Sequence, residues 1–538
     1  MIDVKLSILF EQSRSLKVIF ILILILYCGW IIILNLLYPG FQTLRYNNPL
    51  WLVYHLYPIF YLLICCFLII FFTIIYNKIQ KQILNIVFLS IFSLIIYGTP
   101  YYVSTFARFP DTISIVKNVH ELPPFFLNQS NAYVSNFPTS YIFLKIINLT
   151  TNLDLFYFAR YIFAPLCLVS IITLWYIFIT KVFDSRIALI SSMLIIPSQI
   201  VEISITPNSF SILLMLILLI LCVEPVELMH NTQKRKNVKP TIILLFTVLV
   251  ISHPINAGIL LSMLIIFYIG EYLLKIKKYF ISLKELFLFI CIWGFWLVFL
   301  TMTGNSLIKV LSKMISGNSF GLEMGIRYSV GNTGFIYPLI DQLSAMKYSL
   351  YGLFTLFIIL YIISLHLSNL NGPADISVLP FLIISGFLTL LTFFNLIFGG
   401  FDIQNIISRT MNFAMYSLCT FIAFFIPAII ISKTKATKFM KILFVLILSF
   451  SLLTYPIYSF ARDAYINYPQ SEENGRLFSE NYFLNEKRQI IEISKSEGFY
   501  LFMYGKISFE KLMTRNMKIF NDNKYYSNDW YIIGERVE

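Results

Sequence analysis

Long runs of apolar residues alternate with short polar connections along almost the whole chain. A helix that crosses the hydrocarbon core of a bilayer needs about 20 mainly apolar residues, because each residue advances the helix by about 1.5 Å. On that criterion the pattern predicts thirteen spans. They are residues 17–38, 50–76, 83–103, 158–180, 187–204, 210–223, 242–252, 257–272, 286–302, 348–367, 378–398, 413–431 and 442–458. The pattern therefore predicts an all-α polytopic membrane protein.

Composition agrees with that fold class and limits the partners. Hydrophobic residues make up 58% of the chain and its mean hydropathy is +0.79, above the roughly 45–50% apolar content of soluble domains. The 40 Lys and Arg residues outnumber the 27 Asp and Glu residues. Because most of these charges lie in short connections between apolar runs, we expect membrane lipids and no nucleic acid as partners. All seven cysteines lie inside apolar runs, which argues against a disulfide framework or a thiolate metal site.

The basic residues predict an orientation in the membrane. The first span is too long for a cleaved signal sequence, so we expect a retained anchor with a cytoplasmic N-terminus. Alternate connections then carry the positive charges, as the positive-inside rule requires. These are Lys78, Lys81, Lys181, Arg186, Lys234, Arg235, Lys236, Lys239, Lys275, Lys277, Lys278, Lys284, Lys433, Lys435, Lys438 and Lys441. Only the inner turn 368–377 lacks one. The expectation is a multi-pass protein of the plasma membrane with an extracytoplasmic C-terminus.

This register divides the chain into two parts. Residues 1–460 form the transmembrane domain, with a first external loop at 104–157 and a second at 303–347. Residues 461–538 mix charged residues with Tyr and Phe in the proportions of a soluble protein. They are too few for an extensive core, so we expect a small extracytoplasmic α/β cap.

The first external loop concentrates polar residues that solubility does not explain. It contains Arg108-Phe109-Pro110-Asp111 and His120-Glu121 in a chain that is only 12% charged. We interpret it as the reactive loop. Asp111 follows a proline and is either a helix N-cap or a catalytic carboxylate.

The order of short motifs around this loop resembles a known family. Over about residues 101–223, the chain is similar to the N-terminal half of the GT-C superfamily of integral-membrane glycosyltransferases. The resemblance is strongest to archaeal and bacterial members related to protein mannosyltransferases and lipid A aminoarabinose transferases. The motifs are Pro110-Asp111, His120-Glu121, Asn131-Ala132-Tyr133, Phe137-Pro138, Asn152-Leu153-Asp154, Lys181-Val182-Phe183 and Arg186-Ile187-Ala188.

The resemblance implies a GT-C-type bundle and a specific reaction. The donor would be a polyprenyl-phosphate-linked hexose or pentose, and the acceptor a glycan, lipid or protein on the outer face. An acidic residue of the first external loop would act as the base, and Asp111 matches that position. An attacking hydroxyl must lose its proton, which a nearby carboxylate can accept. Family members often carry a histidine soon after the acidic residue, whereas here position 115 is Ile and the nearest is His120.

Other polar residues could contact the substrate. A leaving phosphate needs cationic stabilisation, which a guanidinium provides through paired hydrogen bonds. Arg409 and Arg108 are the candidates, although Arg409 could instead snorkel at the membrane interface. His120 and Glu121 are candidate substrate contacts. For Glu121, a solvated loop carboxylate or a helix cap is favoured over a catalytic or metal-binding role. A divalent metal shared with Asp111 is the one cofactor that the sequence leaves open.

One further residue and one further loop lie outside this set of candidate substrate contacts. His253, which precedes Pro254 at the end of a short span, is expected to cap a kink or bond a carbonyl rather than to contact substrate. The loop 303–347, with Lys309, Lys313 and Arg327, would suit an O-antigen polymerase or ligase type enzyme. A lipid-linked-sugar flippase or other transporter is the further alternative, but it would be expected to show internal repeats and polar groups at the bilayer midplane.

Overall fold

The computed structural model describes most of the apolar part of the chain. The described residues are 14–41, 51–76, 81–103, 115–116, 119, 138–198, 206–223, 232–274, 282–300, 338–367, 378–398, 403–432, 434–461, 489–492 and 530–533.

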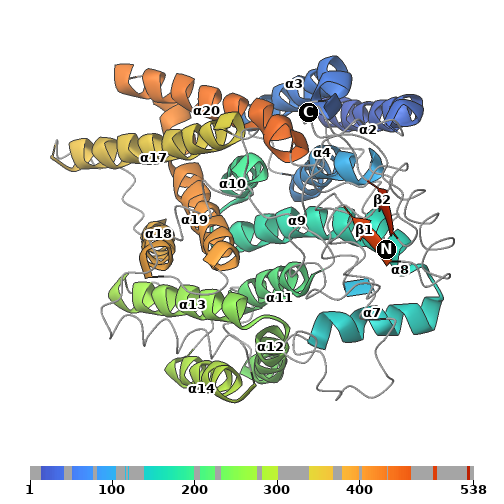
Figure 1. Ribbon diagram of the computed structural model, residues 1–538. Coiled ribbons are helices and arrows are strands. Elements are labelled where there is room, and N and C mark those ends of the chain that lie inside the picture. Colours follow the sequence, from blue (N-terminus) through green and yellow to red (C-terminus); the bar gives the residue numbers. More distant parts are fainter. Residues whose placement is uncertain are drawn as a thin grey trace.

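The described chain is a bundle of helices (Figure 1). They are α2 (Arg14–Phe41), α3 (Trp51–Tyr76), α4 (Gln82–Val103), α7 (Pro138–Thr151), α8 (Leu155–Tyr157), the π-helix η1 (Phe158–Phe163), α9 (Ala164–Val182), α10 (Ser185–Ile195), the 3₁₀ helix η2 (Ile196–Ser198), α11 (Pro207–Cys222), α12 (Thr232–Ser252), α13 (Pro254–Leu274), α14 (Leu283–Leu300), α17 (Pro338–Leu367), α18 (Leu379–Phe398), α19 (Ile403–Ile431) and α20 (Lys435–Ala461). Each of the thirteen predicted spans overlaps a helix of this set, and residues 50, 199–204, 301 and 302 of those spans lie outside the described residues. Within the described residues, six helices are long and apolar enough to cross a membrane. The prediction of an all-helical polytopic membrane protein is confirmed.

Local sequence signals explain where several helices begin. The Asp184 carboxylate accepts hydrogen bonds of 2.8 Å from the backbone N–H groups of Arg186 and Ile187, which caps α10. At α11, the Thr206 hydroxyl accepts from the N–H of Ser209, and Pro207 occupies the first helical position. Both are favoured starts because they satisfy or remove N–H groups that have no partner inside the helix.

Helix α7 gives structure to the second half of the first external loop. Its Tyr141 and Leu144 are buried, and the ring of Phe143 lies 5.2 Å from that of Phe210 in α11. Lys145 Nζ donates to the carbonyl of Val119, 3.1 Å away. The loop is therefore packed against the transmembrane helices at α7.

The centre of the bundle joins α9, α10 and α19. The Trp175 ring lies 5.1 Å from the Tyr416 ring, and its Nε1 donates to Ser191 Oγ at 3.2 Å. Ser191 Oγ in turn lies 2.8 Å from Thr420 Oγ1. Buried hydroxyls in a membrane protein need such partners because lipid offers none, so these pairs bind the three helices together.

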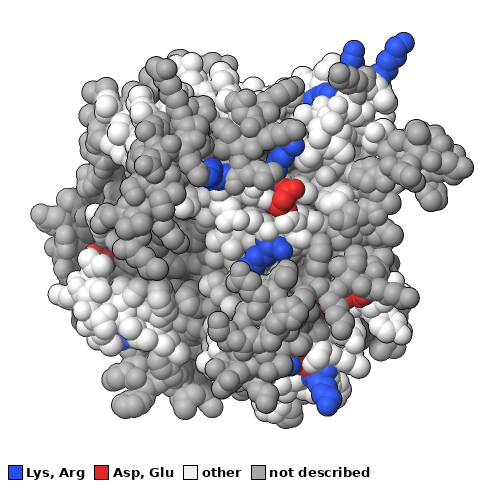
Figure 2. All heavy atoms as spheres, turned by 180° about the vertical axis from the view of Figure 1, so that it is seen from behind, with Lys and Arg blue, Asp and Glu red and all other residues white. Residues whose placement is uncertain are grey.

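Cations cap the C-terminal ends of three helices on one side of the bundle. Arg186 Nη2 donates to the Ile75 carbonyl of α3 at 3.3 Å, and Lys181 Nζ donates to the Ile220 carbonyl of α11 at 3.4 Å. Lys441 Nζ bonds the carbonyl of Ser432, directly after α19, at 2.8 Å. A helix C-terminus carries partial negative charge, which a cation stabilises. We call the side that holds Lys181, Arg186 and Lys441 the basic face. Lys and Arg side chains also occur elsewhere on the surface, as the view from behind in Figure 2 shows.

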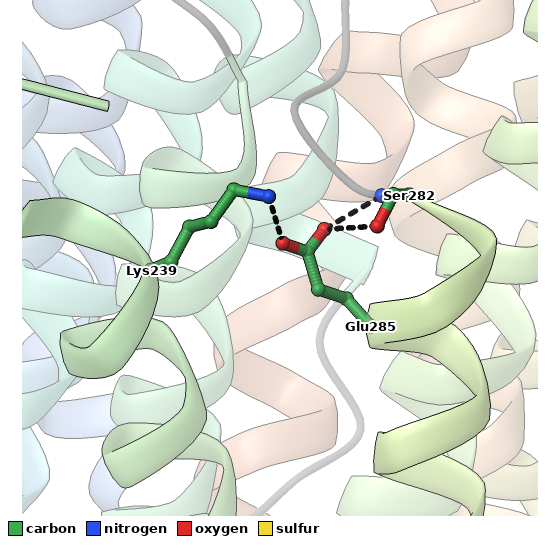
Figure 3. A network of polar contacts seen from close by, with 3 residues as sticks. All are labelled: Lys239, Ser282 and Glu285. Atoms are coloured by element: carbon green, nitrogen blue, oxygen red, sulfur yellow. Dashed lines mark hydrogen bonds and ion pairs between the residues drawn. The ribbon is translucent and has the colours of Figure 1, made fainter. Parts of the chain in front are cut away.

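An ion pair joins α12 to α14 (Figure 3). One oxygen of the Glu285 carboxylate accepts from the backbone N–H and hydroxyl of Ser282, at 2.7 and 2.9 Å, and the other pairs with Lys239 Nζ. Burial raises the pKa of Glu285, but the bonds from Lys239 and Ser282 outweigh it and leave the pKa below its usual value. The carboxylate is therefore ionised at neutral pH and holds the start of α14 against α12.

Part of the predicted C-terminal cap is described. Strands β1 (Gln489–Glu492) and β2 (Trp530–Ile533) pair in parallel, with Gln489 opposite Trp530 and Glu492 opposite Ile533. The other residues of 461–538 lie outside the described residues, so the α/β cap and the domain boundary near residue 460 stay predictions.

Candidate functional site

The predicted site residues divide between described and undescribed parts of the chain. Arg108, Asp111, His120 and Glu121 lie outside the described residues. Arg409 is described and lies in α19. Arg409 and its surroundings are therefore the described part of the predicted site.

Arg409 lies within the bundle at the end opposite to the basic face. It belongs to the second turn of α19, whose other end carries the Lys441 cap. Only 8% of its surface is exposed. A snorkelling arginine would place its guanidinium in interfacial water, whereas charged groups turned into a bundle commonly mark a substrate or ion path. The burial of Arg409 favours the second interpretation.

His253 interacts electrostatically with Arg409, although 156 positions separate the two residues in the sequence. It occupies the turn between α12 and α13, where its N–H bonds the Leu249 carbonyl and its carbonyl accepts from the Ala257 N–H. Its side chain is buried. Burial lowers the pKa of His253 well below 6.5, and the nearby charge of Arg409 lowers it further. The imidazole is therefore neutral near pH 7.

Sequence reasoning assigned His253 only a structural role at a kink. The structure adds its proximity to the guanidinium. The signal in the sequence was the shared depth of the two residues, since the predicted register places His253 and Arg409 at the same end of their spans. That register did not say which helix ends meet.

Hydrogen bonds fix the helix ends that carry these two residues. Asn256, in the first turn of α13, donates from Nδ2 to Asn208 Oδ1 at 2.8 Å and to Ser211 Oγ, both in α11. Thr410 follows Arg409 in α19, and its hydroxyl oxygen forms a hydrogen bond of 2.7 Å with the hydroxyl oxygen of Thr392 in α18. His253 and Arg409 therefore lie at helix ends that side-chain hydrogen bonds join to the neighbouring helices.

Helix α14 supports the same turn from another side. Trp293 Nε1 donates to the Pro254 carbonyl at 2.7 Å. A Cβ atom on Gly258 would lie only 3.0 Å from the Trp293 ring, so this glycine permits the close approach of α13 and α14.

Lys347 has a different role. Its buried Nζ donates to the Pro197 carbonyl at 2.9 Å, and Tyr351 OH donates to the Leu194 carbonyl at 3.0 Å. These bonds satisfy carbonyls at the C-terminal end of α10 and in η2. Helix α17 begins at Pro338, so residues 338–347, expected in the second external loop, are helical.

The arrangement is suited to bind an anion. Arg409 supplies a permanent positive charge, and the neutral imidazole of His253 supplies a dipole, in a setting largely shielded from water. Among the described residues, no group of three or more His, Cys, Asp or Glu side chains could hold a metal ion. The candidate metal residues Asp111 and Glu121 are outside that part of the chain.

Comparisons with known proteins give one structural likeness. No protein-family model matches the chain, and no characterised protein matches it by sequence. The oligosaccharyltransferase of Archaeoglobus fulgidus in the apo form aligns with a TM-score of 0.43 and 12% sequence identity. The alignment covers 80% of this chain and 60% of that enzyme.

Proposed function

We propose that this chain is a GT-C-type membrane glycosyltransferase. It moves a hexosyl or pentosyl group from a polyprenyl-phosphate-linked donor to a glycan, lipid or protein acceptor on the outer face, with inversion at the anomeric carbon. The observation that carries the proposal is the buried Arg409 beside His253, at the end of the bundle opposite to the basic face. The motif order of residues 101–223 supports the same reaction.

Each residue has a defined part in the reaction. The acceptor oxygen attacks the anomeric carbon on the side away from the phosphate, while the bond from that carbon to the phosphate oxygen breaks. Asp111 takes the proton of the acceptor hydroxyl. The phosphate leaves with the bonding electrons, and Arg409 stabilises the developing charge through two parallel N–H donors. Arg108, His120 and Glu121 contact the substrate.

Binding of the carrier lipid tests this function. We expect purified protein in lipid nanodiscs to bind polyprenyl phosphate at least tenfold more tightly than uncharged polyprenol, because only the phosphate engages Arg409. Adding acceptor to the protein loaded with a polyprenyl-phosphate sugar should then release polyprenyl phosphate. Equal affinity for the two lipids would refute the anion site, and binding without release would favour a flippase.

The proposed orientation places Asp111 outside and the basic face in the cytoplasm. In a variant with its seven native cysteines replaced by serine, Asp111→Cys should react with an impermeant maleimide in intact cells. Lys236→Cys and Lys438→Cys should react only after permeabilisation, because their basic clusters stay inside. The reverse labelling pattern would place the proposed reaction on the wrong side of the membrane.

A further inference from the structure

The side chain of Asn256 has an unused hydrogen-bonding atom. Asn256 is fully buried, and Nδ2 makes the two bonds to Asn208 and Ser211 described above. Its Oδ1 is buried and has no hydrogen-bond partner among the described residues. A buried carbonyl oxygen without a donor is unfavourable, and such atoms in native proteins call for an explanation.

The location of this oxygen links it to Arg409. Asn256 follows His253 by three positions, and the bond from the Ala257 N–H to the His253 carbonyl closes the turn that contains both. Residues three apart on a helical turn share a face. Gly270, towards the other end of α13, adjoins Pro380 at the start of α18, whereas Thr392 in the second half of α18 bonds Thr410, the neighbour of Arg409. Together with the electrostatic interaction between His253 and Arg409, this arrangement puts the oxygen of Asn256 at the same end of the bundle as the candidate phosphate contact.

The chemistry of the atom selects its ligand. An amide oxygen only accepts hydrogen bonds, so it does not suit a fully ionised phosphate group, which also only accepts. A sugar joined to that phosphate presents several hydroxyl donors within a few bonds of it. The Asn208 and Ser211 contacts hold the amide in one orientation, so the oxygen is already placed before a ligand binds.

We propose that Asn256 Oδ1 accepts a hydrogen bond from a hydroxyl group of the donor sugar whose phosphate is held by Arg409. This inference rests on the proposed function and assigns to Asn256 the recognition of the sugar, separately from recognition of the lipid phosphate. A site with a buried polar atom discriminates strongly against ligands that leave the atom unpaired.

The test compares lipids with and without the sugar. The probes are polyprenyl-phosphate-mannose and polyprenyl-phosphate-glucose, with polyprenyl phosphate as the sugar-free reference. For the wild type, we expect at least one sugar-bearing lipid to bind more tightly than the reference. Asn256→Leu, which has a similar volume, should reduce that preference by about 2- to 10-fold while the Kd for polyprenyl phosphate stays within twofold of wild type.

A matched variant separates recognition from anchoring. Asn208→Ala removes one of the two α11 partners of the Asn256 amide but leaves Oδ1 and the bond to Ser211 in place, so it should keep more of the preference than Asn256→Leu. An equal loss in both variants would assign Asn256 to anchoring alone and overturn the proposal. So would an unchanged preference in Asn256→Leu.

Monodeoxy donors provide a measurement that needs no variant. In the wild type, removal of one particular sugar hydroxyl should weaken binding by about 2- to 10-fold, and Asn256→Leu should be insensitive to that removal. If Asn256→Leu does not fold, equal binding of every monodeoxy donor to the wild type overturns the proposal. Failure of the wild type to prefer polyprenyl phosphate over polyprenol would overturn the proposed function itself, which is a different result.

Discussion

Asp111→Asn is expected to slow sugar transfer by about 10²- to 10⁴-fold while the Kd for the donor stays near the wild-type value. The carboxylate accepts the proton of the acceptor hydroxyl in the transition state, and general bases contribute rate factors of this size. Asparagine keeps the shape of the side chain but cannot accept that proton. Single-turnover transfer from a donor-loaded enzyme measures the chemical step, and equilibrium titration measures donor binding.

A structural Asp111 would give a different result. Asparagine is about as good an N-cap as aspartate, so the loss of stability should be at most about 1 kcal/mol and the enzyme should remain active. Glu121→Gln, in the same loop, is the matched control and should retain much more activity. Transfer by Asp111→Asn at the wild-type rate would remove the base assignment, and Glu121 would be the next carboxylate to test.

Arg409→Ala is expected to weaken donor binding by roughly 10- to 150-fold. Loss of a hydrogen bond to a charged group costs about 1.5–3 kcal/mol, and each 1.4 kcal/mol corresponds to a tenfold change in Kd. Arg409→Lys should give an intermediate loss, because an ammonium group keeps the charge but not the two parallel donors. Titration with polyprenyl phosphate measures both variants.

Arg186→Ala controls for the loss of a partly buried guanidinium. Arg186 bonds the Ile75 carbonyl of α3 and lies on the basic face, at the far end of the bundle from Arg409. It should lower thermal stability without changing the Kd for polyprenyl phosphate. Donor affinity at the wild-type level in Arg409→Ala would show that the buried guanidinium serves packing and not the carrier lipid.

The sequence was informative about the membrane spans because the hydrocarbon thickness sets a length that apolar residues must fill. The helix ends were less predictable. Helix α17 begins at Pro338 and α19 at Ile403, well before their apolar parts, because a helix can continue past the lipid on hydrogen bonds and tertiary contacts that hydropathy does not report. Helix α7 was not predicted as a helix for a related reason, because it has only 14 residues and a mixed composition.

The candidate site was predictable only one residue at a time. Arg409 stood out as an isolated cation at the outer end of a span. Its interaction with His253 depends on the packing of α13 near α19. These two helices are far apart in the sequence, so no local sequence pattern predicts that they meet. A functional role for Asn256 could not be predicted from the sequence, because asparagine is common near helix starts, where its side chain bonds the local backbone.

Lys181, Arg186 and Lys441 combine two roles that protein engineers usually treat as separate. As positive charges beside apolar spans, they are the residues one would move to invert the insertion of the chain. As donors to the carbonyls of Ile220, Ile75 and Ser432, they also complete the ends of α11, α3 and α19. A variant in which these three positive charges are moved elsewhere would therefore also lose the hydrogen bonds that complete three helix ends. The side chains that the positive-inside rule predicts to set the insertion direction are therefore the same ones that complete these helix ends.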